Sequence, residues 1–404
     1  MKQLRNAGAD ITAKTSLDEF GMGSHTQNAN SGPLSSPFRR GGEPLSPGGS
    51  SGGSAVAVAK GEAWASLGTD TGGSVRLPAA YCGVVGFKPS YGMLSRWGVI
   101  QYANSLDTVG IIADNVSDVE QVFKPLNKYD ANDPTSLTES LRKRIGSIAR
   151  HDKQKLRVGV PQEYNIEELS PEVRQTWSDT LSLLQEAGHA LVPVSLSTTQ
   201  QALSAYYVLA PAEASSNLAK YDGIRYGHRT SGADASPDEN LPLYARTRGE
   251  GFGDEVRRRI LLGAYALSSE AIDNYFIQAQ KIRRLVQQDF DRVFSAANPL
   301  LDGSVAREEE GVDVLLTPTA PSLPPTLAEL QRQTPVESYM LDVFTVPASL
   351  AGLPALSVPA PLPEDARASM DAGDVRTVGM QIIGQFGADE DVLAAGRLLE
   401  NLYK

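Results

Sequence analysis

Residues 47 to 80 read PGGSSGGSAVAVAKGEAWASLGTDTGGSVRLPAA, and the interpretation of the whole chain depends on this stretch. Two clusters rich in glycine and serine, PGGSSGGSA at 47–55 and GTDTGGSVRLPAA at 68–80, flank a run of small apolar residues. We interpret this run, residues 55–67, as a buried helix. Glycine permits positive φ and close backbone approach, so a glycine cluster can turn successive N–H groups toward one point.

Convergent N–H groups of this kind suit the oxyanion of a tetrahedral intermediate, where each donor is worth about 2.7–4 kcal/mol. The alternative is a pair of flexible linkers, because Gly and Ser are the usual linker residues. Both clusters, however, lie between apolar segments, and no G-x-x-x-x-G-K-[ST] phosphate-binding motif occurs. We therefore predict an oxyanion hole, with the following backbone N–H groups as candidate donors: Thr71, Gly72, Gly73 and Ser74.

A serine nucleophile needs a base that takes its proton. The chain has four histidines, and no G-x-S-x-G elbow surrounds Ser74. His25 lies in the loop before Ser50, where we expect a structural role. The other three lie in polar stretches and are expected at the surface: His151, His189 and His228. The sequence therefore favours a Ser-Lys arrangement over a histidine triad.

Composition restricts the class of protein. The 404 residues are 41% hydrophobic and 21% charged, and we expect a single domain over residues 1–404. A net charge of −11 argues against broad contact with a nucleic-acid backbone. The single cysteine, Cys82, excludes an internal disulfide and a multi-cysteine zinc site, and its apolar surroundings predict burial. The sequence contains no apolar run of roughly 18 residues, the length that would predict a membrane span.

Strand and helix patterns alternate along the chain. Residues 1–20 predict a helix and then a strand, and LRVGV at 156–160 predicts a buried strand. A helix is expected to open at Ser170 and Pro171 and to end at Gly188. A long helical stretch over 255–294, strands over 312–318 and 379–384, and a final helix over 391–404 complete the pattern. Such alternation indicates an α/β protein with a largely parallel or mixed sheet covered by helices.

The two clusters with their flanks, GGSSGGSAVAV at 48–58 and LGTDTGGSVRLPAAYCGVVGFKPSYG at 67–92, resemble the amidase signature. The resemblance implies the amidase-signature fold, a large mixed β-sheet with helices on both faces. It also implies that Ser74 is the nucleophile of an acyl-enzyme. Ser50 matches the bridging serine that follows a cis peptide bond and relays the proton toward a lysine.

Within this superfamily the chain is most similar to the A subunits of glutamyl-tRNA(Gln) amidotransferases. The similarity runs along the whole chain and includes KTSLDEFGMGSHTQNAN at 14–30, PAEASSNLAKYDGIRYGHR at 211–229 and DVFTVPASLAGLPALSVP at 342–359. It implies that three residues hold glutamine: Arg259, Asp342 and Tyr206. An arginine fork grips a carboxylate bidentately and a carboxylate pairs with an ammonium group, which fits a free amino acid.

Each of these three residues also has a plainer explanation. Arg259 belongs to a triple arginine, 257–259, on a helix whose other arginines are expected to face solvent. Asp342 could cap a helix, and Tyr206 could lie at the edge of the core. Only the resemblance favours the ligand role.

The resemblance implies that glutamine hydrolysis releases ammonia, which a partner subunit uses with ATP to convert Glu-tRNA(Gln) to Gln-tRNA(Gln). Two partners are expected: the B subunit, and a small subunit that is either C-type or its fungal equivalent. The B-type partner should bind ATP, Mg²⁺ and most of the tRNA, and this chain should need no cofactor, metal or membrane. Two alternatives stay open: a stand-alone amidase of small organic amides, and a scaffold subunit without a catalytic lysine.

In the family the catalytic lysine precedes the first serine cluster by several dozen residues, within a Lys-Asp motif at a strand end. None of Lys14, Lys60 and Lys88 stands in such a motif. We therefore expect the chain to lack an N-terminal segment and, as written, to be a poor enzyme. The extended stretch SAANPLLDGSVAREEEG at 295–311 suggests an organellar protein of the mitochondrial matrix, with a bacterial cytoplasm as the alternative.

Overall fold

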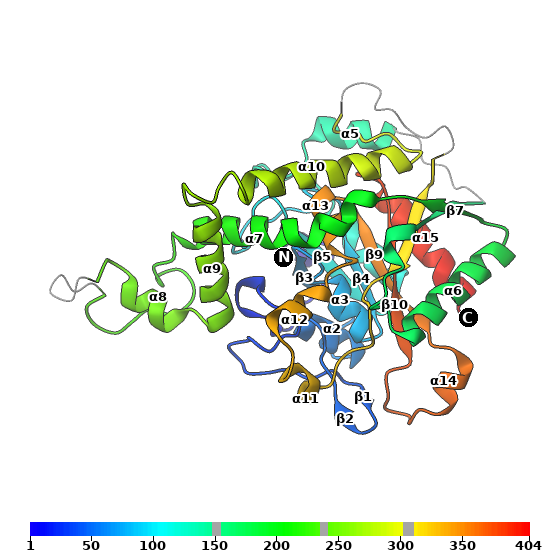
Figure 1. The fold of residues 1–404 in the computed structure, drawn as a ribbon, viewed down its shortest axis with the longest axis horizontal. Coiled ribbons are helices and arrows are strands. Elements are labelled where there is room, and N and C mark those ends of the chain that lie inside the picture. The colour runs from blue at the N-terminus through cyan, green and yellow to red at the C-terminus, as the bar shows by residue number, and fades with distance from the viewer. Residues whose placement is uncertain (148–154, 235–240, 302–310) are drawn as a thin grey trace.

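A mixed sheet runs through the centre of the molecule, with helices on either side of it (Figure 1). The computed structural model describes residues 1–147, 155–234, 241–301 and 311–404. His151 and most of the extended stretch at 295–311 lie outside these residues. Among the described residues, no helix combines the length and the hydrophobicity that a membrane crossing requires.

The sheet has eight strands in the order β3-β5-β4-β9-β10-β8-β6-β7. All pairs from β3 through to β8 are antiparallel, and only β8, β6 and β7 run parallel to one another. The sheet is therefore mixed, as predicted, and largely antiparallel rather than parallel. In the same order, the strands are β3 Ala65–Asp70, β5 Thr108–Ala113, β4 Val85–Lys88, β9 Ala355–Pro361, β10 Thr377–Ile383, β8 Val314–Pro318, β6 Arg157–Pro161 and β7 Ala190–Val194. A separate hairpin pairs β1 Arg39–Arg40 with β2 Glu43–Pro44.

Helices cover both faces of the sheet, as predicted. Neighbouring residues of β5 point to opposite faces, so Ile111 packs in the same cluster as Val116 of one layer, whereas Ile112 packs with Ala55 of the other. One layer contains α4 Val116–Leu126, α15 Asp389–Leu402 and α6 Pro171–Glu186. The other contains α2 Gly52–Ala59, α3 Arg76–Tyr81, α13 Val346–Ala351, α7 Ala202–Leu218 and α10 Phe276–Val293. The remaining helices are α1 Lys2–Asn6, α5 Glu139–Ser147, α8 Ala245–Gly251, α9 Asp254–Ala266, α11 Leu327–Leu330, α12 Pro335–Met340 and α14 Glu364–Ala368, with short 3₁₀ turns η1 Glu19–Gly21, η2 Gln162–Tyr164 and η3 Ser197–Gln201.

Three predicted elements differ from the structure. The helix expected over 55–67 is α2, which ends at Ala59; the chain turns at Gly61, where φ is +68°, and residues 65–70 form strand β3. No strand occurs within residues 1–20, because Asp18 holds this segment in a loop by accepting the N–H groups of Thr26 and Asn28. The long helix over 255–294 is two helices, α9 and α10.

The crossing of α7 and α9 brings together residues far apart in the sequence. These helices pack so closely that a Cβ at Gly263 would overlap the carbonyl of Pro211. Because Gly263 has no side chain, α9 can lie directly against α7. In the same layer α10 lies beside α7 (Figure 1). This packing positions Arg259 of α9 beside Tyr207 of α7.

Candidate active site

The two serine clusters lie side by side. The N–H of Ser51, which begins α2, donates to the carbonyl oxygen of Ser74 at 3.1 Å. The Gly49–Ser50 peptide is cis, as the resemblance implied. The Oγ of Ser50 is buried and has no hydrogen-bond partner among the described residues. A buried hydroxyl without a hydrogen-bond partner is rare in proteins, and a catalytic role is one explanation for it.

Residues 71–74, here called the oxyanion loop, connect β3 to α3. Thr71, Gly72 and Gly73 are buried, whereas Ser74 is partly exposed. Within the described parts of the chain, the four backbone N–H groups of this loop donate to no protein acceptor. The loop therefore offers free donors around the partly exposed Ser74, which is the arrangement an oxyanion requires.

Glycine is needed at position 72, because the loop passes directly under an aromatic ring. A Cβ at Gly72 would lie 2.7 Å from the Oη of Tyr206. Any other residue would push the loop or the ring aside. Tyr206 is itself buried, and its ring packs edge-on against that of Tyr207 with the centroids 5.0 Å apart.

A buried ion pair supports the oxyanion loop from below. Arg76 donates from Nε and Nη2 to the two oxygens of Asp70 at 2.9 and 2.8 Å, and both side chains are fully buried. Burial disfavours the charged carboxylate, but Arg76 beside it holds the pKa of Asp70 below its usual range. Asp70 also accepts the N–H of Val75 at 3.2 Å. Asp70, which precedes the loop, is thereby bonded to Val75 and Arg76, which follow it.

Arg259 is buried, with 4% of its surface exposed, so the solvent-facing alternative is wrong. Its Nε donates to Oε1 of Glu255 at 2.7 Å and its Nη1 to the hydroxyl of Tyr102 at 2.7 Å. Nη2 donates to no acceptor in the described part of the chain. Three tyrosine rings lie 5.6–5.7 Å from the guanidinium carbon, those of Tyr102, Tyr207 and Tyr339. The guanidinium is held in place with one edge free to donate.

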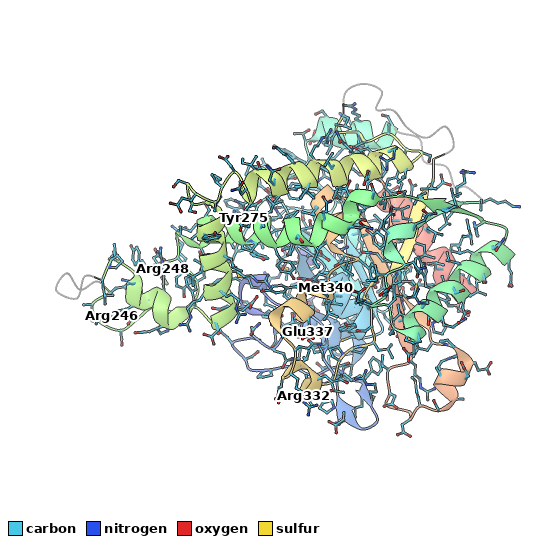
Figure 2. The ribbon with its side chains drawn as sticks, viewed as in Figure 1. Arg246, Arg248, Tyr275, Arg332, Glu337 and Met340 are labelled. Atoms are coloured by element: carbon cyan, nitrogen blue, oxygen red, sulfur yellow. The ribbon has the colours of Figure 1, made fainter. Side chains whose placement is uncertain are left out.

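Asp342 lies between α12 and α13, just beyond Glu337 and Met340 of α12, which are labelled in Figure 2. Its carboxylate accepts the hydroxyls of Tyr207 at 2.9 Å and Ser24 at 3.3 Å. Burial raises the pKa of Asp342 to about 6, although the Tyr207 hydrogen bond and the charge of Arg259 act in the opposite direction. Its side chain therefore caps no helix and points toward the tyrosine cluster.

The sequence reasoning missed Tyr207. Of the two adjacent tyrosines it is Tyr207 that contacts both Arg259 and Asp342, and its ring stacks on Tyr339 with the centroids 4.0 Å apart. Tyr206 lies against the oxyanion loop instead. Neighbouring helix positions point about 100° apart, so the two tyrosines have different partners. Tyr102 and Tyr339 were also missed, because nothing in their local sequence marks them.

A cavity of about 870 Å³ adjoins the oxyanion loop, within the size range of small-molecule sites. Its walls include Thr69, Thr71, Tyr102 and Asp107. Gly21 also lines it, and a Cβ at Gly21 would lie 3.7 Å from the Oγ of Ser50. The cavity therefore reaches the second cluster through Thr69 and Thr71, whereas no residue of the first cluster is among the described residues that line it.

The lysines near the signature occupy three different environments. Lys60 directly follows α2 and is half-exposed, and Lys14 is exposed at the rim of the cavity. Lys88 ends strand β4 and is fully buried. Its Nζ donates to the carbonyls of Pro89 and Leu353. Burial, together with the nearby Arg76, lowers the pKa of Lys88 to about 7.

Cys82 is buried as predicted, and burial raises the pKa of its thiol to about 12.

His25 is buried with Nδ1 2.8 Å from the Oγ of Ser46, and burial lowers its pKa to about 4, in keeping with a structural role. His228 is half-exposed beside Glu250. The prediction for His189 was wrong: it is buried and accepts the N–H of Leu156, which fixes the start of β6.

Comparisons with known proteins show the family of the chain. The Amidase family model matches residues 1–393. The A subunit of a mitochondrial glutamyl-tRNA(Gln) amidotransferase from Ajellomyces capsulatus is 53% identical over 100% of this chain and 83% of its own length. The corresponding protein of Coccidioides posadasii is 57% identical over 99% of this chain and 81% of its own length.

Solved structures give the same result. The A subunit of the Thermotoga maritima glutamyl-tRNA(Gln) amidotransferase has a TM-score of 0.74 and 34% identity, over 99% of this chain and 75% of that one. A protein described as an amidase has a TM-score of 0.73 and 30% identity, over 100% of this chain and 77% of that one. With the sheet, the cis peptide at Ser50 and the oxyanion loop before α3 described above, these matches lead to one conclusion: the chain belongs to the amidase family.

Proposed function

We propose that this chain is the glutamine-hydrolysing component of a mitochondrial glutamyl-tRNA(Gln) amidotransferase, its A subunit. One observation carries the proposal: a buried arginine and a buried aspartate are joined through Tyr207 beside the oxyanion loop. Opposite charges held apart in this way fit a free α-amino acid, whose carboxylate would meet Arg259 and whose ammonium group would meet Asp342. The amide of the side chain would then reach Ser74.

The chemistry follows from these positions. The Oγ of Ser74 attacks the amide carbon of glutamine, and the N–H groups of the oxyanion loop receive the negative charge that forms on the carbonyl oxygen. The proton of Ser74 passes to Ser50, and a proton from Ser50 is delivered to the leaving nitrogen. The C–N bond breaks and releases ammonia, leaving a glutamyl ester on Ser74. Water then hydrolyses the ester to glutamate.

The ammonia would be used by a partner subunit that converts Glu-tRNA(Gln) to Gln-tRNA(Gln). We propose that two further subunits complete the enzyme, one B-type and one small, the latter C-type or its fungal equivalent. The B-type partner would bind ATP, Mg²⁺ and most of the tRNA. The net charge of −11 supports this division, because an acidic chain is a poor ligand for a phosphate backbone. The relatives' names support both the assembly into subunits and the mitochondrial location.

The test replaces the nucleophile in the assembled amidotransferase. Ser74→Ala is expected to abolish transamidation driven by glutamine and to leave transamidation driven by ammonia intact. Ser182→Ala, at an exposed position of α6, is the matched control and should leave both reactions unchanged. Equal loss of both reactions in Ser74→Ala would contradict the proposal.

Two other outcomes would favour the alternatives. Unchanged glutamine-dependent transamidation in Ser74→Ala would indicate a scaffold subunit. Hydrolysis of small amides without partner subunits, and without preference for glutamine, would indicate a stand-alone amidase.

A further inference from the structure

Asp107 lies directly before β5 and belongs to none of the groups assigned above. Its side chain is buried, and Oδ1 accepts the hydroxyl of Thr71 at 2.8 Å. Oδ2 accepts the N–H of Tyr102 at 2.9 Å. Both oxygens lie 3.1 Å from the N–H of Ala103. One carboxylate therefore contacts the oxyanion loop on one side and the backbone of Tyr102 on the other.

Tyr102 carries this connection to the amino-acid site. Its hydroxyl accepts Nη1 of Arg259 at 2.7 Å, and its ring lies 5.7 Å from the guanidinium carbon. Its carbonyl oxygen accepts the side-chain amide of Asn217 at 3.1 Å, which fixes the residue from the direction of α7. A path thus runs by hydrogen bonds from Thr71 to Asp107 and on to the backbone of Tyr102, and from the hydroxyl of Tyr102 to Arg259.

We propose that Asp107 is a positioning residue that sets the distance between the oxyanion loop and Arg259. This proposal rests on the proposed function. Glutamine has a fixed number of bonds between its α-carboxylate and its side-chain amide, so the groups that hold its two ends must keep a matching separation. A misplacement of about 1 Å at the reacting centre costs roughly 100-fold in rate.

A purely local role for Asp107 leaves one contact unexplained. Closing the turn at 102–107 needs only the bonds to the backbone of Tyr102 and Ala103. The bond from Thr71 crosses from a different element, the connection between β3 and α3. Thr71 and Asp107 also share a wall of the cavity. The carboxylate is placed where it can hold both parts of the site.

The test compares three substitutions in the native protein assembled with its partner subunits, with glutamine as substrate. Thr71→Val detaches the oxyanion loop and is expected to lower kcat with little change in KM. Tyr102→Phe detaches Arg259 and is expected to raise KM with little change in kcat. Asp107→Asn cannot accept on both sides, because its amide nitrogen is a donor, so it should change both constants. Each loss should be about 10- to 150-fold, the range for a hydrogen bond to a charged group.

Controls separate positioning from damage to the fold. Thr71→Ser keeps the hydroxyl and should restore kcat to near the wild-type value. Transamidation driven by ammonia should be unchanged in every variant. All rates are normalised to titrated active sites, so that a loss of folded protein does not register as a loss of kcat.

An Asp107→Asn variant in which only one of the two constants changes, or neither, would overturn the inference. If that variant does not assemble, the double variant Thr71→Val with Tyr102→Phe decides. The quantity compared is the loss in kcat/KM. A loss in the double variant at least about threefold smaller than the product of the two single losses supports a shared link, whereas a loss equal to that product overturns it. Wild-type protein that does not hydrolyse glutamine would refute the proposed function instead.

Discussion

Replacing Arg259 by lysine probes the amino-acid site directly. Lysine keeps the positive charge but lacks the planar fork. Its single nitrogen cannot reproduce the bonds that Nε makes to Glu255 and Nη1 makes to Tyr102 while also meeting a substrate carboxylate. Arg259→Lys should therefore weaken glutamine binding without removing the nucleophile.

The size of the effect follows from the bonds that are lost. A hydrogen bond to a charged group contributes about 1.5–3 kcal/mol. Loss of one bond to the substrate carboxylate therefore corresponds to a rise in KM of about 10- to 150-fold. The guanidinium also contacts three tyrosine rings. Each of these contacts that the lysine side chain fails to keep costs about 0.5–2 kcal/mol more.

The assay measures steady-state release of ammonia from glutamine in the assembled enzyme, with transamidation driven by ammonia as the internal reference. Arg257→Lys is the matched control, because Arg257 lies on the same helix, is half-exposed and pairs with Asp254 at 2.9 Å. The control should keep the wild-type KM. An Arg259→Lys enzyme that assembles normally and has an unchanged KM for glutamine would refute the reasoning.

Three further predictions concern the same site. Because burial raises the pKa of Asp342 to about 6, its carboxylate loses its charge as the pH falls through 6. The KM for glutamine should therefore rise about tenfold at pH 5, and Asp342→Asn should have a high KM that no longer depends on this ionisation. Gly72→Ala places a methyl group against Tyr206 and should lower the acylation rate constant, measured by stopped flow, at least about tenfold. A wild-type rate constant would show that the loop is not confined there. Asp70→Asn leaves Arg76 buried without a counter-charge, so the free energy of unfolding in urea should fall by about 3 kcal/mol; an unchanged midpoint would mean that the pair gives no support.

The proposed chemical centre rests on local sequence, because its residues lie in two short clusters. Ser50 and Ser74 stand in glycine-rich turns whose composition already indicates close backbone approach. The cis peptide at Ser50 came only from the resemblance and is present in the structure. Alternation of strands and helices likewise gave the α/β class, since it depends on periodicity alone.

Strand pairing could not be predicted in the same way. β9 and β10 lie between β4 and β8 although they follow both in the chain, and this order depends on contacts between distant segments. The first residues of strand β3, 65–67, were taken as part of a helix because alanine, as at Ala65, favours helices over strands. The turn at Gly61 was the signal that separates it from α2.

The amino-acid site was predicted only in part for a similar reason. Burial of Arg259 depends on α9 lying against α7, which no pattern within the triple arginine reveals. Nothing local distinguishes Tyr206 from Tyr207, since their roles follow from the direction in which each leaves the helix. The positioning role that we propose for Asp107 has no local signal, because its partners, Thr71 and Tyr102, belong to different elements.

The central claim is that Ser74 becomes esterified by the glutamyl group of glutamine. The most direct measurement is to quench the native assembled enzyme in acid during turnover with glutamine, digest it, and locate the glutamyl adduct by mass spectrometry. The account predicts an adduct on the peptide that contains Ser74 and its absence in Ser74→Ala. An adduct on another residue, or glutamine hydrolysis that continues in Ser74→Ala, would contradict it.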